Sequence, residues 1–131
     1  MCSSDLLRDP AAAMLKRVGL GNRRDGLAGN LAHGEQRQLE LAMALATEPS
    51  LLLLDEPAAG MGVDETERMV GLLRELKGTV AILLVEHDMD AVFALADRIS
   101  VLVNGACIAT GTPDEIRNDD DVRRAYLGED S

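Results

Sequence analysis

Apolar residues recur along the chain in two patterns, one typical of helices and the other of buried strands. Helical segments carry apolar side chains every three or four positions, and Gly, Asn or Pro residues stand between these segments. The segment 33–46 has apolar residues on two sides, which is typical of a buried helix. The pattern predicts helices over 6–20, 33–46, 64–77 and 89–96, a short helix from Pro113, and a last helical turn over 122–127.

Three mainly apolar runs, Leu51–Leu54, Thr79–Val85 and Ile99–Val103, alternate with the predicted helices. Such runs are typical of strands that are buried on both faces of a parallel sheet. Asn104-Gly105 is a strong hairpin-turn signal, and Ala106–Ala109 would form the returning strand. Strands that alternate with helices predict an α/β protein with a parallel sheet, flanking helices and a C-terminal hairpin.

Capping residues define where several helices should begin. Asp64, with Glu67 three residues later, resembles a capping box. Asp88 is suited to cap the helix that follows it, and Thr112 precedes a proline and a glutamate in capping-box positions. The acidic run 118–121 lacks the spaced ligands of a calcium loop, so we interpret it as a solvated helix cap.

Composition narrows the classes of function. The chain has 131 residues, and 13 basic against 23 acidic residues give a net charge of −10. This acidic balance disfavours nucleic-acid binding and a polybasic membrane module, and no apolar run approaches the roughly 20 residues of a membrane helix. Cys2 and Cys107 make no disulfide framework, which is typical of a cytosolic protein. We expect Cys107 to be a small core residue.

The first candidate site is the segment Leu31–Gln36, where a helix is predicted to start. Small residues there let backbone N–H groups approach an anion, and a helix N-terminus adds partial positive charge. Taken alone, the motif is equally compatible with an ordinary helix start that contains Gly34. His33 has no clear task in either interpretation.

The second candidate site is Asp55-Glu56, where the run of leucines ends. The carboxyl ends of parallel strands are where α/β sheets bind ligands. Consecutive strand residues point to opposite faces, so the two carboxylates need different tasks. One can hold Mg²⁺, and the other can orient or deprotonate an attacking water. A strand that simply ends in polar residues is the less favoured alternative.

The third candidate site is His87, in the sequence Glu86-His87-Asp88 that ends the second apolar strand. A histidine at this position can hydrogen-bond a phosphate oxygen or position a water. Taken alone, a partly exposed loop histidine is the more ordinary interpretation.

The three motifs together, in this order and with 87 − 56 = 31 residues between Glu56 and His87, resemble the ATP-binding cassette (ABC) transporter ATPases. In that family the first motif is the signature sequence, usually LSGGQ and here LAHGE. The second is Walker B with its catalytic glutamate, and the third is the switch histidine. The resemblance covers about Asn30 to the C-terminus. It implies a partial P-loop NTPase fold whose cofactors are ATP and Mg²⁺.

The resemblance implies a role for each matching residue. Asp55 would hold Mg²⁺ through water, Glu56 would be the general base or position the water, and His87 would be the γ-phosphate switch. The signature residues would contact ATP held by the opposite subunit; they are Leu31, Ala32, His33, Gly34 and Glu35.

The segment Ala59-Gly60-Met61-Gly62 falls where the family has its D-loop. The usual aspartate of the D-loop is Gly62 here. Within the signature, His33 replaces a usual glycine and Glu35 a usual glutamine.

Longer stretches narrow the resemblance to ATPase subunits of branched-chain amino-acid importers. They are LAHGEQRQLELAMALA, DEPAAGMG, EHDMDAVFALADRI and the ending GTPDEI…VRRAYLG. Importers of urea or short amides share much of this pattern and remain an alternative. A different class is a catalytically inactive fragment or interaction protein that retains the fold. ABC ATPases of DNA repair are disfavoured by the acidic charge.

The resemblance also implies partners and a location. The partners are a second ATPase subunit in a head-to-tail dimer and transmembrane permease subunits, with no nucleic acid. The protein would then be cytoplasmic and peripheral on the inner face of the plasma membrane.

No G-x-x-x-x-G-K-[ST] phosphate loop occurs in the sequence, and the adenine-stacking aromatic and the Gln-loop of the family also have no match. We therefore expect a C-terminal fragment that is inactive on its own. The expected divisions are a leader without kinship to the family over 1–6, part of the helical subdomain with the signature over 7–48, the C-terminal part of the ATPase core over 49–111, and a branched-chain-importer-type tail over 112–131.

The resemblance also predicts which strands are neighbours. Leu51–Leu54 should pair in parallel with Val80–Val85. The family strand that lies between Val80–Val85 and Ile99–Val103 precedes the phosphate loop and has no match here, so these two strands should share no hydrogen-bond ladder. Open strand edges would expose backbone groups and aliphatic side chains, which promotes aggregation.

Overall fold

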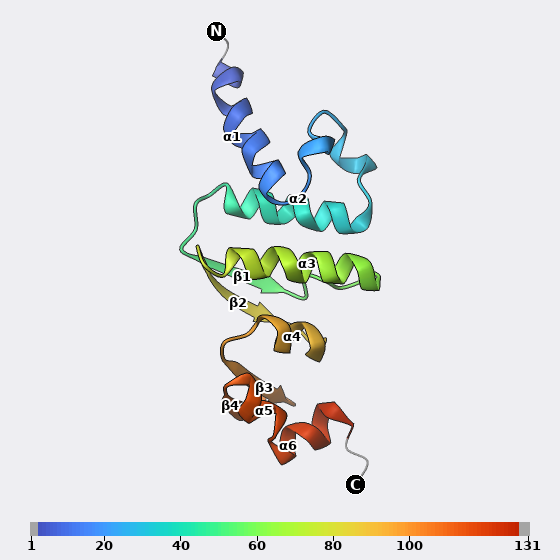
Figure 1. Cartoon of the computed structure of the whole chain (residues 1–131), viewed down its shortest axis with the longest axis vertical. Coiled ribbons are helices and arrows are strands. Elements are labelled where there is room, and N and C mark those ends of the chain that lie inside the picture. Colours follow the sequence, from blue (N-terminus) through green and yellow to red (C-terminus); the bar gives the residue numbers. More distant parts are fainter. Residues whose placement is uncertain (1–2, 129–131) are drawn as a thin grey trace. The chain divides into compact units, whose positions relative to one another are not determined.

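The computed structural model describes residues 3–128 of the chain (Figure 1). The chain divides into two compact units, one that ends at Val85 and one that begins at Glu86, and each is described by itself. Met1 and Cys2, at the start of the expected leader, lie outside the described residues, as do residues 129–131 of the expected tail. None of the described helices combines the length and the apolar character needed to cross a membrane.

The first unit alternates helices and strands in the predicted order. The helices predicted over 6–20 and 33–46 are confirmed, with shifts of a few residues at their ends. Gly19, which has a φ of +85°, follows the first helix and permits the chain to turn. In chain order the elements are α1 (Ser3–Arg17), the 3-10 turns η1 (Gly21–Arg23) and η2 (Ala28–Asn30), α2 (His33–Leu45), β1 (Leu51–Asp55), α3 (Val63–Leu76) and β2 (Ala81–Val85).

Helix α3 buries the apolar face that its periodicity predicts. Met69, Leu72, Leu73 and Leu76 are all buried. The predicted capping box of Asp64 and Glu67 is wrong, because the helix begins at Val63, after Gly62. Glu65 then occupies the third helical position, where its Oε2 accepts a hydrogen bond from the Gly62 N–H at 3.3 Å.

Helix α2 is only partly buried, which corrects the prediction of a helix buried on both of its apolar sides. Leu41, Ala42 and Leu45 are buried, whereas Met43 is 65% exposed. In Figure 1, α3 lies between α2 and the β1–β2 pair, and α1 also contacts α2.

Strands β1 and β2 pair in parallel, with Leu51 opposite Ala81 and Asp55 opposite Val85, as predicted. The expected burial of both faces is wrong. Leu52 is 4% exposed, but Leu53 is 69% and Leu83 is 60% exposed. Successive strand side chains point to opposite faces, and the connecting helix α3 can cover only one of them. We call the uncovered face, with Leu51, Leu53, Ala81, Leu83 and Val85, the bare sheet face.

The second unit is built on an antiparallel hairpin. Strands β3 (Ile99–Val103) and β4 (Ala106–Gly111) are joined by Asn104 and Gly105, whose φ angles are +50° and +80°. Positive φ at both central residues is the requirement of the type I′ turn, so the predicted turn is confirmed. The other elements are α4 (Met89–Leu95), α5 (Pro113–Arg117), α6 (Asp120–Val122) and the π-helical turn η3 (Arg123–Leu127).

The hairpin and the helices before and after it enclose a small apolar core. Ile99, Val101, Ile116 and Val122 are buried together, and Val92, Phe93, Ala96, Ala109 and Leu127 pack against them. The phenol of Tyr126, in the last turn, donates a hydrogen bond to the Leu102 carbonyl of β3. The C-terminal segment is therefore tied to the hairpin by both packing and hydrogen bonding.

The predicted helix caps of this unit are present. Asp88 Oδ1 accepts from the N–H groups of Asp90 and Ala91, at 3.1 and 3.2 Å. Thr112 and Glu115 form the expected reciprocal capping box. The acidic run also acts as a cap, because Asp119 Oδ1 accepts from the Val122 N–H at 3.0 Å.

Cys107 is exposed, so the prediction that it is a core residue is wrong. The β3–β4 register shifts between Val101 and Leu102, and Cys107 lies opposite Leu102 beyond that irregularity. Its Sγ lies 3.4 Å from the Thr110 hydroxyl, on the outer side of the strand. Among the described residues no ladder joins β2 to β3, as predicted, since β1–β2 and β3–β4 form separate sheets.

Candidate functional site

Two carboxylates stand where β1 ends, and the backbone gives them different surroundings. Asp55 is the last residue of the strand and is exposed. Glu56 is half-buried and has a φ of +45°, which is unusual for a residue other than glycine. Its N–H still donates to the Val85 carbonyl of β2 at 2.8 Å. The chain therefore leaves the sheet sharply at Glu56, immediately beyond the last residue of the strand.

The loop after this turn runs from Pro57 to Gly62 and leads into α3. The Ala59 N–H donates to the Glu56 carbonyl at 3.0 Å, and the Met61 N–H donates to the Ala58 carbonyl at 3.1 Å. Gly60, between them, has a φ of +76°. The segment that sequence analysis matched to the D-loop is thus a sequence of tight turns that ends at the start of a helix.

The segment matched to the signature forms the start of α2, as predicted. Leu31 and Ala32 are extended, and the helix begins at His33. The Ala32 N–H donates to Glu35 Oε1 at 3.2 Å, and the Gln36 side-chain amide donates to the Leu31 carbonyl at 3.2 Å. A hydrogen-bonded first turn of this kind fixes the direction in which the remaining N–H groups point.

Glu35 places a carboxylate beside this helix start. Negative charge near a helix N-terminus is favourable for the helix but competes with an anionic ligand for the same N–H groups. Arg23 lies 3.5 Å from the Glu35 carboxylate and offsets part of its charge. An anion that approaches α2 here therefore meets one acidic and one basic side chain.

The signature and D-loop segments lie against each other within the first unit. His33 Nε2 is 3.1 Å from the Ala59 carbonyl oxygen. A Cβ placed on Gly34 would be 3.0 Å from Glu65 Oε1, so the first turns of α2 and α3 are in close contact. A small hollow between these turns is lined by Gly34, Glu35, Gln38, Met61, Glu65, Arg68 and Met69.

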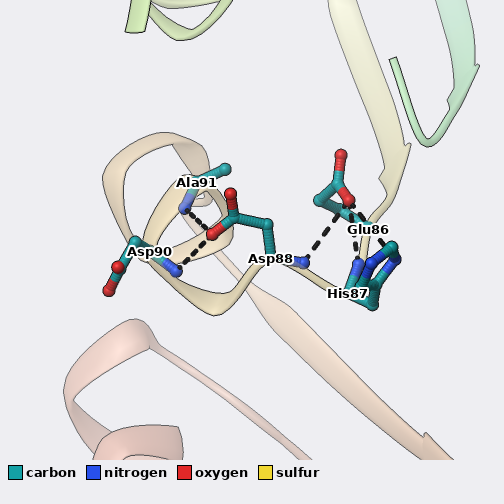
Figure 2. Close-up of polar contacts among 5 residues, drawn as sticks. All are labelled: Glu86, His87, Asp88, Asp90 and Ala91. Carbon is teal, nitrogen blue, oxygen red and sulfur yellow. Dashed lines mark hydrogen bonds and ion pairs between the residues drawn. The ribbon is translucent and has the colours of Figure 1, made fainter. Parts of the chain in front are cut away.

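His87 belongs to the second unit, in the turn before α4 (Figure 2). Glu86 Oε1 accepts from the backbone N–H groups of His87 and Asp88, at 3.0 and 3.4 Å. The same oxygen lies 3.7 Å from His87 Nδ1, and the Glu86 side chain is 4% exposed whereas that of His87 is 74% exposed. A buried carboxylate therefore orders the turn and leaves the imidazole accessible.

Sequence analysis brought together only part of this arrangement. The structure joins segments 31–36 and 59–62 in one unit, which also holds Asp55 and Glu56, while His87 is in the other unit. It also identifies Glu86 and Glu65 as organising residues that the sequence motifs did not single out. The sequence signal that could have identified these two glutamates is local, because each carboxylate accepts from backbone N–H groups no more than three residues away.

Asp55 fits a magnesium ion only as one ligand among several. Within residues 3–128 no three His, Cys, Asp or Glu side chains converge as a preformed metal site. Mg²⁺ is commonly held by one or two carboxylates together with waters and substrate phosphates. An exposed aspartate at the end of a parallel strand has the hard oxygen chemistry for that arrangement.

By sequence and fold, the chain belongs to the ABC transporter ATPase family. The model of the ABC transporter family matches residues 6–59, and that of the branched-chain amino acid ATP-binding cassette transporter matches residues 106–131. The fold agrees: the chain is similar to an ATP-binding cassette of an ABC transporter in its ADP conformation (TM-score 0.80, 31% identity, 91% of this chain and 49% of that one). A nucleotide-free cassette from an ABC transporter gives a TM-score of 0.81 at 32% identity, over 92% of this chain and 50% of that one.

Among individual proteins, the chain is similar to LivG, a high-affinity branched-chain amino acid transport ATP-binding protein of Salmonella typhimurium. The two are 50% identical over 123 residues, which are 92% of this chain and 48% of LivG. BraF of Pseudomonas aeruginosa, named for the same transport, is 46% identical over 91% of this chain and 48% of its own length. LptB of Escherichia coli, a lipopolysaccharide export protein, is 35% identical over 98% of this chain and 54% of its own length. The chain thus spans about half the length of the curated relatives it matches.

Proposed function

We propose that this chain is part of the ATP-hydrolysing subunit of an ABC importer for branched-chain amino acids. The observation that carries this proposal is the match of residues 106–131 to the branched-chain cassette model, a segment that includes β4, α5 and the last turn. The higher identity to LivG and BraF than to LptB supports import over lipopolysaccharide export. Import of urea or short amides is the alternative substrate class.

The proposed roles of the strand-end residues follow from their positions. Asp55 would hold Mg²⁺ through water with its exposed carboxylate, and Glu56 would accept a proton from the attacking water or orient it. His87 would hydrogen-bond the γ-phosphate with its imidazole, since the side chain is 74% exposed. Mg²⁺ in such sites neutralises charge on the transferred phosphoryl group.

The signature residues Leu31–Glu35 would contact ATP bound by a second ATPase subunit in a head-to-tail dimer. Gly60, Met61 and Gly62 would form the D-loop, although Gly62 lacks the carboxylate that the family usually has there. We propose that residues 7–48 belong to the helical subdomain, 49–111 to the ATPase core and 112–131 to the importer-type tail. Transmembrane permease subunits would hold the protein on the cytoplasmic face of the plasma membrane.

A chimera with a known relative tests the proposal. LivG of Escherichia coli K12 is 49% identical to this chain over 123 residues. Replacing the matching half of LivG by residues of this chain should restore leucine uptake in cells that lack LivG. Uptake of urea or acetamide instead of leucine would favour the alternative substrate class. A chimera that accumulates to the level of LivG but imports neither would contradict an importer role.

Within the chimera, Glu56→Gln should lower ATP hydrolysis about 10²- to 10⁴-fold while ATP binding persists, because an amide is a poor base. Glu75→Gln, on the exposed side of α3, is the matched control and should hydrolyse ATP like the parent chimera. Undiminished hydrolysis by Glu56→Gln would exclude Glu56 as the catalytic carboxylate.

Asp55→Asn should act through the metal, so excess Mg²⁺ should partly restore its activity. His87→Ala should slow hydrolysis without loss of solubility.

The 131-residue chain itself should neither bind Mg-ATP at micromolar concentration nor hydrolyse it, because its sequence contains no phosphate loop. Titration calorimetry measures this directly. Micromolar binding would show that the described residues grip nucleotide in a way that the family resemblance does not imply.

A further inference from the structure

His33 makes a contact that its place in the signature does not explain. The residue lies at the first position of α2, where the family usually has glycine, and its ring reaches a backbone carbonyl 26 residues further along the chain. The Nε2–O distance to Ala59 is 3.1 Å, which is a good hydrogen-bond length. A glycine at position 33 could not make this bond.

The acceptor fixes the state of the imidazole. A carbonyl oxygen only accepts, so His33 Nε2 has to carry the hydrogen. In the neutral ring the proton is then on Nε2 and not on Nδ1. This assignment holds for as long as the contact exists, and it is therefore a measurable property of the contact.

The loop that receives the bond is shaped to accommodate the ring. Gly60 has a φ of +76°, and a Cβ added there would lie 3.2 Å from His33 Nε2. The imidazole thus occupies the space beside Gly60 that a side chain would need. The loop's own bonds, from Ala59 to Glu56 and from Met61 to Ala58, are local, whereas the His33 bond reaches a distant element.

A second contact lies alongside the first. Glu65, which caps α3 through the Gly62 N–H, also touches the open side of Gly34. Glu35 caps α2 in the same way through the Ala32 N–H. The start of α2, the loop and the start of α3 are therefore joined at two points, His33 with Ala59 and Gly34 with Glu65.

We propose that His33 is a positioning residue that locks the 59–62 loop onto the first turn of α2. The signature and the loop then move as one piece. The catalytic consequence rests on the proposed function, in which both segments face ATP in a dimer; the lock itself does not. Locking would keep the two segments in register during each opening and closing of such a dimer.

The lock can be measured in the 131-residue chain without any nucleotide. Nitrogen-15 NMR of the two imidazoles should show the Nε2–H tautomer for His33, with its signals assigned by their loss in His33→Gln. Water exchange of the Ala59 and Met61 amides should rise roughly three- to ten-fold in His33→Ala, the effect of one lost hydrogen bond. Amides in the middle of α3 should not change.

Two amide variants of different length form the matched control. The amide nitrogen of glutamine reaches about as far as imidazole Nε2, so His33→Gln should restore slow exchange of the loop amides. Asparagine is shorter, so His33→Asn should behave like His33→Ala. An Nδ1–H tautomer in the wild type, or equal loop exchange in all four proteins, would overturn the lock.

The catalytic consequence is tested in the LivG chimera. His33→Ala should lower kcat for ATP hydrolysis several-fold with little change in KM, and His33→Gln should recover it. If the chimera with His33 intact is inactive, the proposed function fails while the NMR result stands by itself. If the chimera is active and His33→Ala hydrolyses ATP at the same rate, the lock has no catalytic role.

Discussion

The two sheets of this chain are equally small but differ in how completely they are covered. The β3–β4 hairpin buries Ile99 and Val101 at 7% and 6% exposure, packed with α4 before it and with the helices that follow it. The β1–β2 pair leaves Leu53 and Leu83 at 69% and 60% exposure. Both pairs are rich in aliphatic residues, so composition does not explain the difference.

Topology explains it. An antiparallel hairpin needs only a two-residue turn, and the next residues of the chain return to cover its inner face. A parallel pair needs a crossover helix, which covers one face, and such sheets normally carry helices on both faces. The hairpin therefore has its inner face covered by segments close to it in sequence. In the parallel pair the crossover helix covers one face, and among the described residues the other face stays exposed.

The largest difference should come from truncating a covered and a bare side chain. Ile116→Ala, at 1% exposure in the hairpin core, should lower the free energy of unfolding by about 2–5 kcal/mol because it leaves a cavity. Leu83→Ala, on the bare sheet face, should cost under about 1 kcal/mol. Urea unfolding followed by circular dichroism measures both. Equal losses would mean that the bare sheet face is covered in solution.

Self-association tests the bare sheet face directly. The double variant Leu53→Thr, Leu83→Thr keeps strand-forming residues but removes apolar surface, so light scattering should begin at about tenfold higher protein concentration. Met43→Gln is the control, since Met43 is equally exposed but lies on α2. If Met43→Gln raises the concentration at which scattering begins as much as the double variant does, the bare sheet face is not the surface through which the chains associate.

Two glycine substitutions should have opposite signs in the two units. Gly105→Ala forces a side chain into the +80° φ of the hairpin turn and should destabilise by about 1–2 kcal/mol. Gly71→Ala, inside α3 with open space around it, should stabilise by about 0.5–1 kcal/mol. Thermal unfolding gives both signs, and a neutral Gly105→Ala would argue against the type I′ turn.

Helix caps should show the smallest effect. Thr112→Ala removes the acceptor for the Glu115 N–H and should cost about 1 kcal/mol. Thr112→Ser keeps the hydroxyl and should stay within about 0.5 kcal/mol of the wild type. An equal loss in both variants would assign the effect to the methyl group and not to the cap.

Local signals made the hairpin turn and the helix caps of the second unit predictable. The Asn104-Gly105 turn and the caps at Asp88 and Thr112 depend on residues within a few positions of each other. The local sequence is therefore enough to predict them. The parallel pairing of β1 with β2 also followed from the strand–helix–strand pattern. The start of α3 was predicted wrongly. The capping box of Asp64 with Glu67 has the right spacing, but the folded chain caps the helix with Gly62 and Glu65, which have the same spacing.

Burial and the candidate site were predictable only in part. An unbroken apolar run such as Leu51–Leu54 shows that both faces of the strand are suited to burial. It does not show which segment of the chain covers each face. The positions of Asp55 and Glu56 at a strand end were foreseen, but the left-handed φ of Glu56 was not. The contact from His33 to Ala59 joins distant segments, and no local pattern encodes it.

Tyr126 is an intrinsic fluorescence probe of the C-terminal segment. The sequence contains one tyrosine and no tryptophan, so ultraviolet emission excited at the tyrosine band comes from this side chain. Its phenol donates to the Leu102 carbonyl, and the residue is 43% exposed. Any event that frees the tail from the hairpin would transfer that hydrogen bond to water and change the emission, so the detachment of this segment can be followed without a label.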